Sequence, residues 1–297
     1  MGDFAVNVAL AYQTGAARGD HSILSAMDVR DEEFFAAFGQ SINDLILRHR
    51  KDLERKRETR SAALKLDAKW LEATSMAVGP KRRWVDGTPE YSFYVCALRK
   101  LFPGALFIHI VRDVHAVVRS MLNFHRVAGG RLVSKEQEAY DYWFRAVNSC
   151  LQAERAYGPK VVYRIRHEDL IGNPDSAMHS LLAFLEEPYT ARCLEPLKER
   201  INSSTVPADF RADDPATDPA IVKKASQLYV ELGRSPQPAE ASSAAADKME
   251  AAFRDRIRYV ANLDNAYQQA LRTSGKLSAS ALASHQPTEL ALSTGND

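Results

Sequence analysis

Short apolar runs alternate with amphipathic stretches through the middle of the chain. The runs at 104–111 (GALFIHIV) and 160–166 (KVVYRIR) are rich in β-branched and aromatic residues, which is typical of strands buried on both faces of a sheet. Apolar positions at helical spacing follow each run, and a longer helix is predicted over 135–157, ending at Gly158 and Pro159. Strands interleaved with helices predict an α/β fold, in which a parallel sheet is flanked by helices.

Two amphipathic helices are predicted outside this alternation, at 31–78 and 245–272. The first has apolar residues at steps of three and four, and the second has a single apolar stripe. Such a stripe must be covered by its own domain or by a partner helix. Composition predicts a linker before the second helix and a disordered tail after it. The predicted organisation is an α/β domain at 1–232, a flexible linker at 233–244, a helix at 245–273 and a disordered tail at 274–297.

Composition narrows the classes of partner. The 297-residue chain has a net charge of +1, so no overall field attracts nucleic acid, and an anion site must come from a local arrangement. No apolar run approaches the roughly 20 residues that a membrane-spanning helix needs. The cysteines Cys96, Cys150 and Cys193 are widely spaced and lack the spacing of a zinc site. We therefore expect no bound metal and free thiols in a reducing cytoplasm.

Arg112 and Ser120 form the main candidate binding site. Arg112 directly follows the first predicted strand, and open α/β sheets bind ligands at the carboxyl ends of their strands. Asp113 is the predicted N-cap of the next helix, and Ser120 returns to nearly the same helical face about 10 Å further along the axis. A forked guanidinium and a hydroxyl suit a tetrahedral anion such as phosphate. The alternative is that Arg112 pairs with Asp113 or a neighbouring helix, and that Ser120 is a small polar surface residue.

A series of short motifs runs through residues 80–207 in a fixed order. It comprises a Thr-Pro-Glu helix start, the stretch LFPGALFIHIVRD, a serine eight residues after its arginine, and an EDL turn leading into an FL helix. This series resembles the sulfotransferase family, and is most similar to the bacterial branch that acts on carbohydrates and other hydroxylated acceptors. The matching residues are Thr88-Pro89-Glu90, Leu101-Phe102-Pro103, Arg112-Asp113, Ser120, Glu168-Asp169-Leu170, Pro174 and Phe184-Leu185.

The resemblance implies a fold, a donor and a reaction. The implied fold is the P-loop NTPase-like sulfotransferase fold. The implied cosubstrate is 3'-phosphoadenosine 5'-phosphosulfate (PAPS), with Arg112 and Ser120 binding its 3'-phosphate. The implied acceptor carries a hydroxyl group, and a glycan is one candidate. Catalysis of such an in-line transfer depends mainly on positioning and on cations that meet the charge of the leaving phosphate.

One motif of the family is not found. Its members hold the 5'-phosphosulfate with a Gly-rich loop after the first strand, whereas the nearest stretch here, TGAARG at 14–19, lacks the Ser/Thr pair and is interpreted as an ordinary loop. The fold is therefore expected to be N-terminally incomplete. Either the chain begins inside the domain, or it is a degenerate member that binds a nucleotide or a partner without catalysis. The second alternative predicts self-association through the helices at 31–58 and 245–272.

The general base has several candidates. Asp86 could accept the acceptor's proton, although an aspartate near a turn equally suits a helix cap. His109 lies within the first predicted strand and is expected to be a packed core residue. His115 and His125 are expected at the surface. His167 occupies a position where relatives have a tyrosine, which we interpret as local variation.

Overall fold

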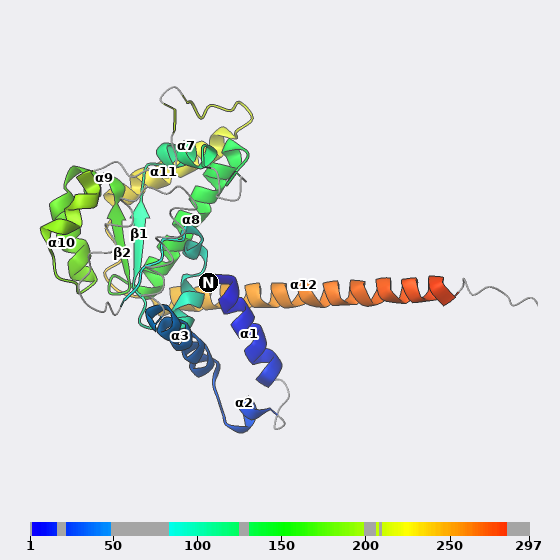
Figure 1. The fold of residues 1–297 in the computed structure, drawn as a ribbon. Helices are drawn as coiled ribbons and strands as arrows, with labels where there is room; N and C mark the ends of the chain where they lie inside the picture. Colours follow the sequence, from blue (N-terminus) through cyan, green and yellow to red (C-terminus); the bar gives the residue numbers. More distant parts are fainter. Residues whose placement is uncertain are drawn as a thin grey trace, which may run out of the picture. The chain divides into compact units, whose positions relative to one another are not determined.

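The computed structural model describes residues 2–16, 22–48, 83–124, 131–198, 206–207 and 210–283. The chain divides into two compact units, Met1–Phe253 and Arg254–Asp297. The helices in Figure 1 are α1 (Gly2–Ala16), α2 (Ile23–Ala26), α3 (Asp31–Arg48), α6 (Val95–Leu101), α7 (Val114–Leu122), α8 (Glu136–Tyr157), α9 (His167–Gly172), α10 (Pro174–Phe184), α11 (Pro219–Arg234) and α12 (Ser243–Ala283). Short 3-10 helices cover Pro89–Phe93 and Ala191–Lys198. Within these ranges, no helix is long and apolar enough to cross a membrane.

A parallel pair of strands lies at the centre of the first unit. The strands β1 (Phe107–Val111) and β2 (Val162–Arg166) run side by side in Figure 1, and both fall on the predicted apolar runs. Their register pairs Val111 with Arg166. The connection between them contains α7 and α8, as a parallel crossover requires. The prediction of an α/β fold with a parallel sheet flanked by helices is confirmed.

The two faces of this sheet are covered unequally. On one face, His109 and Val111 are buried and lie toward α8. On the other face, the Tyr163 ring stacks on Phe184 of α10, with ring centroids 5.1 Å apart. Ile110 shares that second face but is 56% exposed. The prediction that β1 is buried on both faces is therefore wrong, because among the described elements α10 covers the β2 side of this face and leaves the β1 side open.

A hydrophobic core forms between α7, α8 and α11. Asp113 caps the start of α7, and Glu138 closes a capping box at the start of α8. Gly158 ends α8 with a φ of 70°, a conformation that glycine adopts without strain. Each large apolar side chain buried here contributes about 1.5–3 kcal/mol. The most deeply buried members are Val111, Val114, Val118, Ala139, Tyr140 and Ala225.

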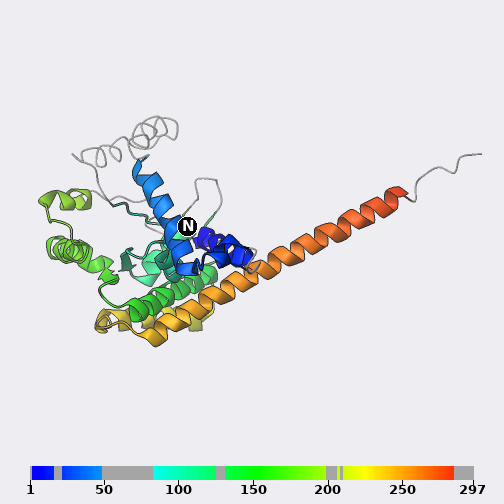
Figure 2. The ribbon, with the colours of Figure 1, turned by 90° about the horizontal axis from the view of Figure 1, so that it is seen from below.

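The described residues before position 83 form the helices α1, α2 and α3 and the turn between α2 and α3 (blue in Figure 2). Helices α1 and α3 pack against α6, and at Gly39 a β-carbon would lie 1.6 Å from the Leu101 carbonyl oxygen, so only glycine permits this approach. In the TGAARG stretch, Thr14 to Ala16 end α1, and the rest lies outside the described residues. The helix predicted at 31–78 is observed as α3 to Arg48, and its remainder also lies outside them.

The segment predicted as a flexible linker at 233–244 is bonded to the domain. The Gln237 side-chain amide accepts a hydrogen bond from the Arg164 backbone amide at 3.0 Å and donates one to the Val162 carbonyl at 2.8 Å. It thereby pairs with the outer edge of β2 as a neighbouring strand would. The Ser242 amide donates to the Arg155 carbonyl at 2.8 Å. Helix α12 then runs beyond the predicted 245–273, into the stretch predicted as a disordered tail at 274–297, and ends at Ala283.

Candidate functional site

Arg112 lies at the carboxyl edge of the sheet beside β2. Because Val111 pairs with Arg166, the next residues, Arg112 and His167, also lie next to each other. Burial lowers the pKa of His167, and the positive charge of Arg112 lowers it further. This neighbourhood could not be predicted from the sequence, since it depends on the register of two strands that are far apart along the chain.

The Arg112 guanidinium is half-buried and not engaged by its sequence neighbour. The Asp113 carboxylate accepts a hydrogen bond from the Ala116 amide at 2.8 Å and so caps α7. In the part of the chain that the structure describes, no hydrogen bond or ion pair holds the Arg112 side chain. Among these residues, the alternative that Arg112 pairs with Asp113 or a neighbouring helix is therefore not observed.

Ser120 lies on α7, two turns after Arg112. It is half-buried and lies outside the buried stripe of α7 formed by Val114, Val118 and Met121. The neighbouring Arg119 donates to the Pro207 carbonyl at 3.5 Å, and its Nε is buried without a hydrogen-bond partner in the described residues. This second cation at the end of α7 was not identified from the sequence.

Asp86 is held by the helix start that follows it. Its Oδ1 accepts hydrogen bonds from the Thr88 hydroxyl at 2.6 Å and the Thr88 amide at 3.0 Å, and its Oδ2 accepts one from the Tyr91 hydroxyl at 3.0 Å. Although burial favours the neutral acid, these bonds lower the pKa of Asp86. A carboxylate that accepts from the amide two residues on forms an Asx-turn. The turn leads into the 3-10 helix whose N-cap is Thr88, so Asp86 is a turn residue before the helix rather than its cap, and the role of general base stays a prediction.

The other histidines have different surroundings. His109 is 6% exposed, and its Nδ1 lies 2.6 Å from the Oε1 of the fully buried Glu154, so it is a core residue as predicted. His115 is exposed, with ring nitrogens 2.8 Å from the Tyr140 hydroxyl and 3.3 Å from the Ser226 hydroxyl. His125 lies outside the described residues. Within the described ranges, no three His, Cys, Asp or Glu side chains converge as a metal-binding group.

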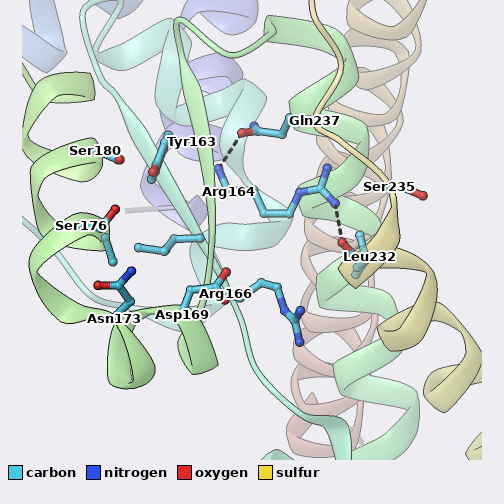
Figure 3. Close-up of a pocket in the computed structure, with 12 residues that line it drawn as sticks. Tyr163, Arg164, Arg166, Asp169, Asn173, Ser176, Ser180, Leu232, Ser235 and Gln237 are labelled. Carbon is cyan, nitrogen blue, oxygen red and sulfur yellow. Dashed lines mark hydrogen bonds between the residues drawn. The ribbon is translucent and has the colours of Figure 1, made fainter.

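A polar cavity of about 450 Å³ follows the outer edge of β2 (Figure 3). On one side are Asn173, Ser176 and Ser180, at the start and along one face of α10, and on the other side Arg164 and Arg166 extend toward α11. Arg112 and Ser120 do not line it. The cavity and the predicted anion site are therefore distinct features.

These observations define a class of protein: an α/β chain with an arginine at the carboxyl edge of a parallel sheet, followed at once by a capped helix. Residues 16–191 match the model of the sulfotransferase family. The chain belongs to that family.

Individual relatives match shorter stretches. The chain is 32% identical to an omega-hydroxy-beta-dihydromenaquinone-9 sulfotransferase of Mycobacterium bovis over 105 residues, which cover 33% of this chain and 27% of that protein. It is 33% identical to protein-tyrosine sulfotransferase 1 of Danio rerio over 96 residues, covering 31% and 26%. The alignments thus span about a quarter of these relatives. A sulfotransferase domain from the curacin biosynthetic pathway is a structural neighbour at 21% identity and a TM-score of 0.32, covering 56% of this chain and 60% of that domain.

Proposed function

We propose that this chain moves a sulfuryl group from PAPS to a hydroxyl of a carbohydrate or other small acceptor, and that Arg112 and Ser120 bind the 3'-phosphate of the donor. Membership of the family supports the reaction class. The observation that carries the assignment of the site is the position of the Arg112 guanidinium where β1 ends and α7 begins, with no hydrogen bond or ion pair to any described residue. Ligands of parallel α/β sheets bind at this edge.

The residues at this edge fit a phosphate ester of the donor. The planar guanidinium of Arg112 can donate two parallel hydrogen bonds to phosphate oxygens, and the Ser120 hydroxyl can donate a third. When bound, PAPS supplies the sulfuryl group that is transferred. The chain itself orients the donor. Asp113 fixes the start of α7, and α7 carries Ser120, so Arg112 and Ser120 belong to one continuous turn-and-helix segment.

The acceptor is proposed by class. The names of the two relatives identify an omega-hydroxylated menaquinone derivative and protein tyrosine as their substrates. Both carry a hydroxyl, although one is a lipid-like quinone and the other a phenol. We therefore propose a hydroxylated acceptor for this chain, with a glycan as one candidate.

A second candidate function is a catalytically inactive, nucleotide-binding interaction protein. The observation that favours it is the helical structure of the described residues before position 83, which contain no strand followed by a Gly-rich turn. Helix α12 also exposes Tyr259, Leu263, Tyr267 and Leu271 at four-residue intervals, and such a stripe would suit the self-association that this alternative predicts.

Two measurements separate these functions. Calorimetry with 3'-phosphoadenosine 5'-phosphate (PAP), the donor without its sulfuryl group, tests the nucleotide site. Transfer of labelled sulfate from PAPS to a panel of sugars, phenols and hydroxylated lipids tests catalysis. Binding together with transfer supports the enzyme, and binding without transfer to any acceptor supports the inactive alternative. If the chain does not bind PAP, both candidates fail.

The Asp86→Asn variant tests whether Asp86 is the general base. Asparagine forms an Asx-turn as aspartate does, so we expect the unfolding midpoint to change little. A proton acceptor in the transition state contributes about 10²- to 10⁴-fold, so loss of such a base would lower kcat by that amount in the labelled-sulfate assay. If kcat instead falls by less than about tenfold, Asp86 acts only through the turn that its three hydrogen bonds stabilise.

A further inference from the structure

We propose that Glu168 and Tyr229 are positioning residues that hold the Arg112 turn in the conformation that binds the nucleotide. This inference rests on the proposed function, since it concerns the same anion site. Neither residue is assigned a contact with the nucleotide. Each acts through the backbone that carries Arg112, and they connect that backbone to α11, which follows β2 by about fifty residues.

The Arg112 turn is fixed on both sides. Before it, Val111 is the last residue of the β1–β2 ladder. After it, the Asp113 amide donates a hydrogen bond to Glu168 Oε1 at 3.2 Å, while the Asp113 carboxylate accepts from the Ala116 amide at 2.8 Å. Arg112 is thus the one residue between the end of a strand and a doubly bonded helix cap. Its backbone direction depends on where Glu168 holds Asp113.

Glu168 is connected to α11 through Arg166. Although burial favours its protonated form, hydrogen bonds from backbone amides, including that of Asp113, lower the pKa of Glu168, and the charge of Arg166 lowers it further. Arg166 donates from Nη2 to the Tyr229 hydroxyl at 3.2 Å and lies over the Tyr229 ring, 5.7 Å from its centroid. Tyr229 therefore holds the Arg166 guanidinium, and Arg166 is the cation that pairs with the carboxylate holding the turn.

Without the Tyr229 hydroxyl, little would hold Arg166 beside Glu168. Arg166 Nε and Glu168 Oε2 are 3.7 Å apart, which is an ion pair without a hydrogen bond. Both atoms are buried, and neither makes a hydrogen bond with any described residue. Buried polar atoms in this state are costly, so the place of the guanidinium beside Glu168 depends on its hydrogen bond with Tyr229. Removing the hydroxyl should let Arg166 move away, so that the Glu168 carboxylate can turn toward water and release Asp113.

The Tyr229→Phe variant tests this coupling, because it keeps the ring beneath Arg166 and removes only the hydroxyl. We expect calorimetry to show PAP affinity lowered about three- to tenfold, the effect of one hydrogen bond, and hydrogen exchange at the Asp113 amide to accelerate. Glu168→Ala should show both effects more strongly. Glu168→Gln retains an acceptor oxygen and should restore part of the Asp113 protection. Tyr259→Phe, at a 55% exposed position of α12, is the matched control and should leave both readings unchanged.

The outcomes distinguish this inference from the function on which it rests. If the wild-type chain binds PAP but Tyr229→Phe alters neither its affinity nor Asp113 exchange, the positioning role is refuted and the proposed function stands. Faster exchange with unaltered affinity also refutes it, since the turn would then move without consequence for binding. If the wild-type chain does not bind PAP, the proposed function fails and the nucleotide role of Glu168 and Tyr229 fails with it. Wild-type binding with both expected changes supports the proposal.

Discussion

Replacing Arg112 with alanine should weaken PAP binding by about one to two orders of magnitude. A hydrogen bond to a charged group contributes about 1.5–3 kcal/mol, and each 1.4 kcal/mol is tenfold in affinity. The same change should cost little stability, because no described residue bonds the Arg112 side chain. Calorimetry with PAP and urea unfolding would separate these two quantities. Loss of binding with an unchanged unfolding midpoint is the expected pair of results.

Three further variants sharpen this experiment. Arg112→Lys keeps the charge but loses the two-pronged geometry, so its affinity should lie between those of the wild type and Arg112→Ala. Ser120→Ala removes a neutral donor and should cost about tenfold or less. Arg234→Ala removes an exposed arginine at the end of α11 and should bind PAP as the wild type does. If Arg112→Ala and Arg234→Ala bind PAP equally well, Arg112 is not a ligand of the nucleotide.

The Arg112→Ala variant also has a consequence that needs no nucleotide. The charge of Arg112 lowers the pKa of His167 by disfavouring the protonated ring. Removing that charge should therefore raise the pKa of His167, and an NMR titration of the imidazole would detect the rise. An unchanged His167 titration would contradict the close approach of these two side chains at the edge of the sheet.

The sequence predicts where the strands and helices of this fold lie better than it predicts which other elements pack against them. Runs of β-branched residues correctly place β1 and β2, and helical periodicity correctly places α8, because both patterns are local. The exposure of Ile110 could not be predicted, since it depends on which elements cover that face of the sheet. The same holds for Gln237: nothing in a Pro- and Ser-containing segment indicates that one amide will pair with the edge of a distant strand.

In the candidate site, too, the local features can be predicted from the sequence and the tertiary contacts cannot. Arg112 and Ser120 can be predicted as candidates from the sequence because one strand end and one helix bring them within eight residues. Tyr229 is missed because its partner Arg166 is 63 residues away. The place of Glu168 beside the Arg112 turn is missed because it depends on the register of the two paired strands. Sequence periodicity places a residue on a face of its own element. Which residue of another element meets it is decided by tertiary packing.

Glu154→Ala should destabilise the chain by about 3–5 kcal/mol, the usual cost of removing one partner from a buried ion pair. Glu154 is fully buried on α8, with His109 Nδ1 2.6 Å from one oxygen and Arg164 Nη2 3.2 Å from the other. The Arg164 side chain is only 8% exposed, so its charge would be left without a counter-charge in the core. Urea unfolding would show the loss as a lower midpoint. Glu240→Ala, at an exposed position, is the control and should leave the midpoint unchanged.

A double variant shows whether charge or packing causes this loss. Well-packed apolar residues often replace a buried ion pair without loss of stability. Glu154→Leu combined with Arg164→Leu should therefore be more stable than Glu154→Leu alone, although the second substitution removes further contacts from β2. If the stability losses of the two single variants simply add in the double variant, the interaction between the charges contributes nothing to stability. The loss then comes from the changed volume of the side chains. If stability is recovered, the loss in Glu154→Leu comes from the buried Arg164 charge that it leaves unpaired, rather than from lost packing between α8 and β2.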